Sequence, residues 1–218
     1  MRVEQLRPRL WRWTAKHPEW TEEIGRDAGW DEEVSSYALV EDDVLVLIDP
    51  LVPADDEARF WQALDDDVHH HGPPRILLTV FWHARSARTI AERYEGSRVF
   101  APAARIDDAC ERVPTAEPYE LGETLPAAIE ARGTEHRGEA VLWIPAHRAL
   151  AAGDLFLGTP DGGVRVVPDN WLRPGVTGAM IRAGLAPLLE LPIDVLLLTH
   201  GRPVLADGRA ALEHALSA

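Results

Sequence analysis

The sequence predicts a layered α/β domain, in which two β-sheets stack together and helices cover the outside. Three observations favour this class. Strand and helix patterns alternate through the first half, a strand-rich stretch occupies the middle, and a helix, a strand and a helix close the chain. At 218 residues, 46% of them hydrophobic, the chain fits a single domain over residues 1–218.

The first half opens on a hairpin. Hydrophobic runs flank an acidic turn at residues 41–43, which predicts two paired strands. Phe60, Leu64 and Val68 then recur at helical spacing with acidic residues opposite them. The expected strands here are Val34–Val40, Val44–Ile48, Arg75–Val80 and Arg98–Phe100, and the expected helices are Pro53–Val68 and Ser86–Tyr94.

The second half begins after a segment rich in proline and glutamate, which predicts irregular structure. Pro187 should kink or end the helix that contains it. The expected strands are Ala127–Ala131, Glu139–Ile144, Ala149–Leu155 and Asp194–Leu198, and the expected helices are Thr177–Leu189 and Asp207–Leu216.

Composition narrows the class of partner. The net charge of −14 argues against nucleic acid or an anionic membrane surface as the partner. A small-molecule ligand stays open. Cys110 is the only cysteine, so no internal disulfide forms. With neither a signal peptide nor a run of about 20 apolar residues, the protein is expected in the cytoplasm. Its abundant Arg, Ala, Pro and Gly indicate a GC-rich, bacterial genome.

Polar side chains of the kind that bind metals stand beside several predicted strands. They are Asp49, His136, Asp154 and His200. Loops at strand ends often carry functional residues, because the sheet fixes their positions. One carboxylate with two imidazoles would suit zinc, iron or manganese. Each residue alone also has a simpler interpretation as a turn former or a hydrogen-bonded histidine.

In this order, from about Val34 to Pro203, the chain resembles the metallo-β-lactamase-fold hydrolases. Asp49 matches the Asp that ends an early strand, His136 the His of a Gly-His-Thr-type loop, Asp154 the metal-bridging Asp, and His200-Gly201 the final His-Gly. The resemblance implies a four-layer αββα sandwich and a hydrolytic metal site.

The departure from this family lies in ILLTVFWHARSA, residues 76–87. With Thr79 placed on the Thr of the family's Thr-His-x-His-x-Asp-His motif, the four ligand positions hold Val80, Trp82, Ala84 and Arg85. His83 is out of register by one residue, and on a strand-like exit it should point away. The motif is therefore degenerate, and a dinuclear metal centre is not expected.

Two arrangements of the remaining groups stay open. One metal ion, zinc or iron, could be held by His136, Asp154 and His200 together. Alternatively, Arg85 pairs with Asp154 and supplies positive charge without a metal, while Trp82 fills the vacated space. The second, metal-free arrangement is slightly favoured.

Tryptophans are the candidates for a substrate pocket. Trp82 lies in the degenerate motif, and Trp11 and Trp13 begin a cluster near the N-terminus that either lines a cavity or packs against a sheet edge. A nucleophile built from His83 and Ser86 is rejected, because the sequence places no acid to orient the histidine.

Two functions follow from the resemblance. The first is a hydrolase-like protein, acting if at all on an ester, thioester or related bond, with Asp154, His200 and Arg85 as the catalytic residues. The second is a non-catalytic, metal-free binding or interaction module that uses the same cavity.

Overall fold

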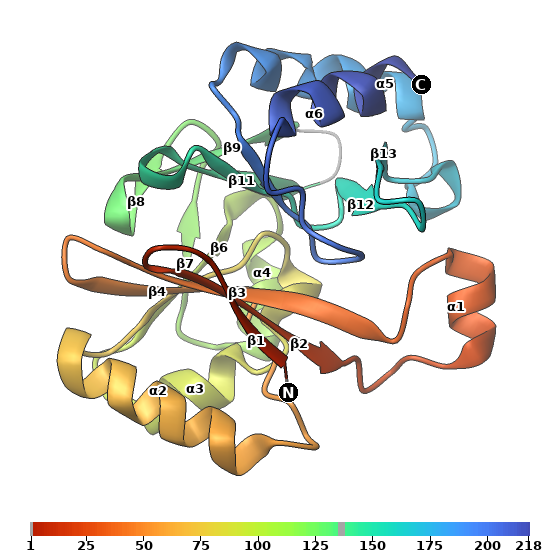
Figure 1. Ribbon diagram of the computed structural model, residues 1–218. Helices are drawn as coiled ribbons and strands as arrows, with labels where there is room; N and C mark the ends of the chain where they lie inside the picture. The colour runs from red at the N-terminus through yellow and green to blue at the C-terminus, as the bar shows by residue number, and fades with distance from the viewer. Residues whose placement is uncertain (1, 135–137) are drawn as a thin grey trace.

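In the computed structural model, which describes residues 2–134 and 138–218, two sheets stack face to face between layers of helices (Figure 1). The first sheet has seven strands in the order β1-β2-β3-β4-β5-β6-β7. The strands from β1 to β4 are antiparallel, and those from β4 to β7 are parallel. Their bounds are Arg2–Arg7, Leu10–Lys16, Glu33–Glu41, Val44–Ile48, Arg75–Leu77, Arg98–Pro102 and Ala116–Tyr119.

The second sheet has the order β14-β11-β10-β9-β8, in which only β14 and β11 are parallel. A two-stranded sheet of β12 and β13 lies beside it. The bounds from β8 to β14 are Thr124–Leu125, Ile129–Thr134, Glu139–Ile144, Ala149–Ala151, Phe156–Gly158, Val164–Val166 and Val195–Leu197.

Six α-helices lie in the described part of the chain. In Figure 1, α2 and α3 lie below the first sheet, α5 and α6 lie above the second, and α1 stands at one side. Their bounds, from α1 to α6, are Glu22–Ala28, Glu57–His71, Ala87–Arg93, Ile106–Arg112, Gly178–Leu185 and Gly208–Ser217. A bilayer-spanning helix needs about 20 hydrophobic residues, and no helix in this part of the chain meets that requirement.

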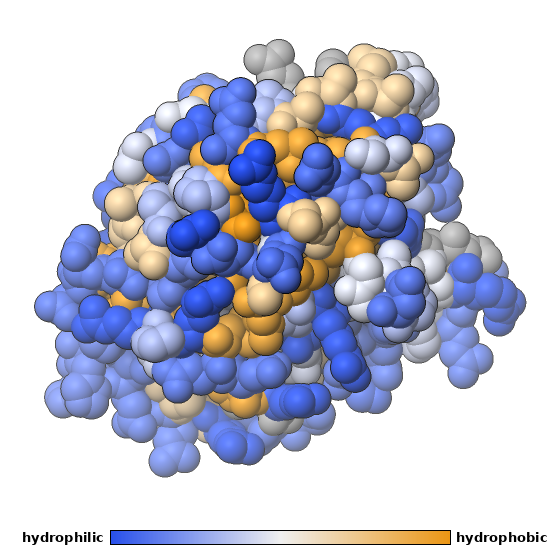
Figure 2. Space-filling model, turned by 45° about the horizontal axis from the view of Figure 1, so that its top comes forward, coloured by the Kyte–Doolittle hydropathy of each residue, from blue (hydrophilic) through white to orange (hydrophobic). Residues whose placement is uncertain are grey.

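Three hydrophobic clusters hold the four layers together. One lies between the sheets and contains Leu39, Ile48 and Leu142. The second joins the second sheet to α5 and α6, and the third joins the first sheet to α2, α3 and α4. The four-layer αββα sandwich is therefore confirmed. Hydrophilic side chains cover most of the face drawn in Figure 2, with hydrophobic atoms visible between them near its centre.

Some elements differ from the expectation. The segment from residue 103 to 125 is not irregular, because it contains α4, β7 and β8. The N-terminal stretch adds β1, β2 and α1, which the sequence pattern did not predict. The helix containing Pro187 does end early: α5 stops at Leu185 and a 3-10 segment continues to Glu190.

Candidate functional site

A cavity of about 840 Å³ opens where loops from both sheets meet. Its wall includes residues from the segment after β2, the turn after β5, the end of α4, and the loops after β11 and β14. Its lining residues are His17, Pro18, Glu19, Trp30, Leu51, Trp82, His83, Ala84, Arg85, Ser86, Arg112, Val113, Asp154, Trp171 and His200.

Asp49 is buried behind the cavity wall, in contact with His83. It follows β4 directly and adopts a φ of +48°, a left-handed conformation that Asp tolerates better than most residues. Its carboxylate accepts hydrogen bonds from the backbone N–H of Thr79 at 2.8 Å and from the Thr79 hydroxyl at 2.6 Å. Asp49 therefore fixes the start of the turn that carries the degenerate motif.

His83 lies inside the site, so the expectation that it points away was wrong. The chain leaves β5 as a single 3-10 turn over Phe81–Ala84, with His83 N–H donating to Val80 O at 3.1 Å, and not as a strand. A 3-10 turn repeats every three residues, so the two-residue alternation of a strand does not apply. His83 is 2% exposed, and its Nδ1 lies 2.9 Å from Asp49 Oδ2. An acid therefore does orient this histidine, although the sequence alone indicated none.

Asp154 sits at a close contact between the two sheets. Gly153 precedes it with a φ of +54°, and a Cβ there would lie 2.8 Å from Thr79 Oγ1, so a side chain cannot fit. The Asp154 backbone N–H donates to the buried carboxylate of Glu139 at the start of β10. These constraints hold the Asp154 side chain, which is itself 5% exposed, in the cavity wall.

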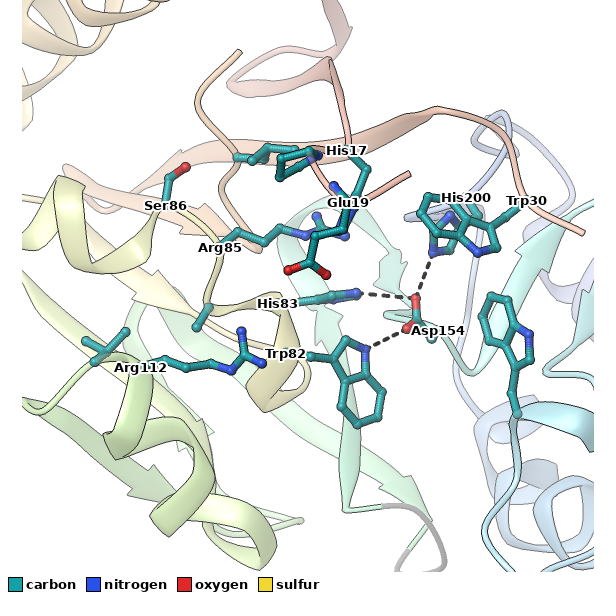
Figure 3. A pocket seen from close by; sticks show the side chains of 15 residues that line it. His17, Glu19, Trp30, Trp82, His83, Arg85, Ser86, Arg112, Asp154 and His200 are labelled. Atoms are coloured by element: carbon teal, nitrogen blue, oxygen red, sulfur yellow. Dashed lines mark hydrogen bonds and ion pairs between the residues drawn. The ribbon is translucent and has the colours of Figure 1, made fainter. Parts of the chain in front are cut away.

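Three side chains engage the Asp154 carboxylate (Figure 3). His83 Nε2 lies 3.3 Å and His200 Nε2 3.1 Å from Oδ1, both within ion-pair distance. The indole N–H of Trp82 donates to Oδ2 at 2.8 Å. Both carboxylate oxygens therefore contact side-chain nitrogen atoms. Of the three residues expected to lie together, Asp154 and His200 do, and His136 lies outside the described residues.

The electrostatics of the site favour a charged His83. Burial and the nearby Arg85 lower the pKa of His83, but the carboxylates of Asp154 and Asp49 outweigh them and raise it to about 9. Burial alone would raise the pKa of Asp154, yet the contacts with His83 and His200 hold it well below its usual range. Burial lowers the pKa of His200. Near neutral pH, an imidazolium at His83 therefore stands between two carboxylates, with a neutral His200 beside it.

Arg85 does not form the expected salt bridge with Asp154. Its Nη1 donates to the backbone O of Asp49 at 3.3 Å, and its Nε is buried without a hydrogen-bond partner among the described residues. His83 takes the place beside Asp154 that Arg85 was expected to take. The 3-10 turn explains the exchange, because it brings residue 83 inward ahead of residue 85.

The tryptophan predictions separate into two groups. Trp82 lines this cavity, whereas Trp11 and Trp13 do not. Those two residues line a second cavity of about 360 Å³, where Trp13 packs against Phe60 of α2 on the outer face of the first sheet. On a strand, residues 11 and 13 share one face, and here that face is turned toward α2.

Two other tryptophans line the cavity instead. The ring of Trp30 lies 4.8 Å and that of Trp171 5.9 Å from the ring of His200. Trp30 belongs to the N-terminal group noted in the sequence, whereas Trp171 follows β13 in a segment with no distinguishing pattern.

The metal implied by the fold does not fit the described residues. Within 2–134 and 138–218, no group of three His, Cys, Asp or Glu side chains is arranged to hold a metal ion. One of the three donors around Asp154 is an indole N–H, which cannot act as a ligand. His83 is protonated on both nitrogens at neutral pH and would have to lose a proton to bind. His136, the third ligand expected for a single ion, lies outside the described residues.

Comparison with solved structures identifies the fold. No protein-family model matches the sequence, and no curated protein does. The DIM-1 metallo-β-lactamase exposed to ceftazidime is similar, with a TM-score of 0.70 and 15% identity over 99% of this chain and 94% of that chain. A metallo-β-lactamase family protein from Thermus thermophilus has a TM-score of 0.65 and 18% identity, over 98% of this chain and 80% of that chain. The metallo-β-lactamase FIM-1 from Pseudomonas aeruginosa, in its mono-zinc form, has a TM-score of 0.68 and 11% identity, over 99% of this chain and 94% of that chain.

These likenesses extend over nearly the whole chain, so this protein has the metallo-β-lactamase fold. At such low identities they establish the fold and not the activity.

Proposed function

We propose that the chain is a metal-independent binding module that holds a small molecule in the cavity around Asp154. The observation that carries this proposal is the contact of both Asp154 carboxylate oxygens with His83, His200 and Trp82. In a metal site that carboxylate would be a ligand, whereas here it anchors the cavity wall. Trp82 donates a hydrogen bond to Oδ2, and the charged His83 lies within ion-pair distance of Oδ1, so these side chains offset the buried negative charge.

The cavity itself has the character of a ligand site. Its volume of about 840 Å³ is within the range of small-molecule pockets. Three indole rings line it, at Trp30, Trp82 and Trp171, together with a few charged groups. Apolar walls with a few oriented polar groups are the usual composition of such a site.

A hydrolase acting on an ester or thioester is the second candidate, and the Asp49–His83 contact at 2.9 Å favours it. An acid-oriented histidine is a familiar part of acid–base catalysis. However, with a pKa of about 9, His83 carries its proton near neutral pH and cannot accept another from water. Binding therefore ranks ahead of hydrolysis.

Binding of an aromatic fragment panel in the presence of EDTA, followed by isothermal titration calorimetry, tests the proposal. We expect fragments to bind wild-type protein with EDTA present, and Trp30→Ala to weaken them. Trp61→Ala is the matched control, because Trp61 packs against Phe60 and Tyr94 on the other side of the first sheet. Fragments that bind only after zinc is added would contradict a metal-independent site.

The same protein samples distinguish hydrolysis from binding alone. Hydrolysis of p-nitrophenyl acetate and of an aryl thioester is measured with wild-type protein and with His83→Gln, again in EDTA. Turnover above the buffer rate that disappears in the His83→Gln protein would place hydrolysis ahead of binding alone.

A further inference from the structure

The Arg85 side chain is half-buried, and its guanidinium has no carboxylate partner among the described residues. Within that part of the chain, Nη1 donates to Asp49 O at 3.3 Å, and Nε is enclosed with no hydrogen bond. Burial lowers the pKa of Arg85, although Asp49 and Asp154 act in the opposite direction. An arginine that remains charged under these conditions gains free energy when an anion reaches it.

The other charges of the cavity do not supply that anion. The carboxylates of Asp49 and Asp154 flank the charged His83, which lies within ion-pair distance of both. Glu19 lines the cavity from an exposed position between β2 and α1. Arg112 lines it too, at the end of α4, and adds a second guanidinium. Arg85 therefore lines the cavity with no carboxylate at ion-pair distance among the described residues.

The backbone at Arg85 is strained. Its φ of +33° and ψ of −105° lie in a region that residues other than glycine rarely adopt. The next residue is tied down, since Ser86 N–H donates to Pro50 O at 3.2 Å and Ser86 Oγ accepts from Val52 N–H at 2.9 Å. Strain of this kind concentrates where a side chain is held for binding or catalysis.

Flat aromatic side chains line the same cavity as these cations. Trp30 and Trp171 flank the His200 ring, at centroid distances of 4.8 Å and 5.9 Å, and Trp82 lines the wall below Asp154 (Figure 3). Such rings bind planar apolar groups by offset or edge-to-face contact.

Building on the proposed function, we propose that Arg85 is the anion-recognition residue of this cavity and that its ligand is a planar aromatic carboxylate. The carboxylate accepts hydrogen bonds from the Arg85 guanidinium, and Arg112 adds long-range attraction. The aromatic body of the ligand lies against the tryptophans.

Two probes that differ in one group test the proposal: naphthalene-2-carboxylate and naphthalene-2-carboxamide, titrated by calorimetry in EDTA. We expect wild-type protein to bind the carboxylate roughly tenfold or more tightly than the amide, as charge-assisted hydrogen bonds allow. Arg85→Gln should bind the acid only as weakly as the amide. Arg88→Gln should keep the wild-type preference, because Arg88 pairs with Glu92 on the surface of α3.

Thermal melting establishes whether each variant is folded. If Arg85→Gln is unfolded, Arg85→Lys replaces it in the titrations. Lysine keeps the charge but lacks the planar fork, so we expect a smaller preference for the carboxylate. Equal binding of the two probes by wild-type protein, or a preference that survives in Arg85→Gln, overturns the anion site and leaves the binding cavity standing. Failure of both probes to bind overturns the cavity proposal as well.

Discussion

Nδ1 of His83 lies 2.9 Å from Oδ2 of Asp49, and the same ring places Nε2 3.3 Å from Oδ1 of Asp154. Asp49 follows β4 of the first sheet, and Asp154 follows β11 of the second. The imidazole therefore joins the two sheets in the wall of the cavity. A charged ring between two carboxylates can hold such a junction by itself, provided that it stays protonated.

Stability should fall on the alkaline side. In the folded protein the pKa of His83 is raised to about 9, against about 6.5 for an unperturbed histidine. The folded state therefore binds this proton more tightly than the unfolded state. Its stabilisation is complete below pH ~6.5 and is lost as the pH rises through about 9. We expect the free energy of unfolding in urea to drop by roughly 3 kcal/mol between these values.

The control for this pH dependence is His83→Gln, which removes the titrating ring and keeps a polar side chain. Its free energy of unfolding should start lower than that of wild-type protein and change much less over the same range. An alkaline decrease of equal size in both proteins would assign the effect to other groups.

Energetic coupling to Asp154 should come from His83 and not from Arg85. A double-mutant cycle with His83→Gln and Asp154→Asn should give an interaction energy of about 1–3 kcal/mol, as for residues in contact. The cycle with Arg85→Gln and Asp154→Asn should give about 0.5 kcal/mol or less, since no contact joins that pair. Both cycles are measured by urea unfolding near pH 7. A larger value for Arg85 would restore the salt bridge that the sequence predicted.

The indole N–H of Trp82 should contribute to stability through Asp154. Trp82→Phe keeps an aromatic ring but removes the 2.8 Å hydrogen bond to Oδ2, so we expect a loss of about 1.5–3 kcal/mol, typical for a bond to a charged group. Trp61→Phe is a matched control, because its indole N–H donates to Glu57 on the exposed face of α2. If the two substitutions lower the urea midpoint equally, Trp82 does not anchor Asp154.

The fold could be predicted because its signals are local and repeated. Continuous hydrophobic runs mark strands β4 and β10, and hydrophobic residues at helical spacing mark α2. Asp49, Asp154 and His200 follow strands in the order that the resemblance implied. The N-terminal strands were missed because Arg12 and Lys16 interrupt the hydrophobic pattern of β2. Arg12 is accommodated there by a hydrogen bond to Ser35 on the neighbouring strand, which no periodicity reveals.

The site was harder to predict, because its geometry depends on one turn. Whether residues 81–84 continue β5 or close into a 3-10 turn decides which of His83 and Arg85 reaches Asp154. That choice is made by distant partners: Thr79 N–H bonds to Asp49, and Thr79 O accepts from the backbone of Ala140 in the second sheet. Contacts between residues so far apart leave no local signature in a single sequence.

Metal content tests the central claim most directly. Protein purified without a histidine tag is analysed for zinc, iron and manganese by elemental mass spectrometry, and its melting temperature is compared with and without EDTA. Because Asp154 is held by His83, His200 and Trp82, we predict less than about a tenth of an equivalent of any of these metals and no change in melting temperature on chelation. Close to one equivalent of metal, with a lower melting temperature in EDTA, would contradict the metal-independent site.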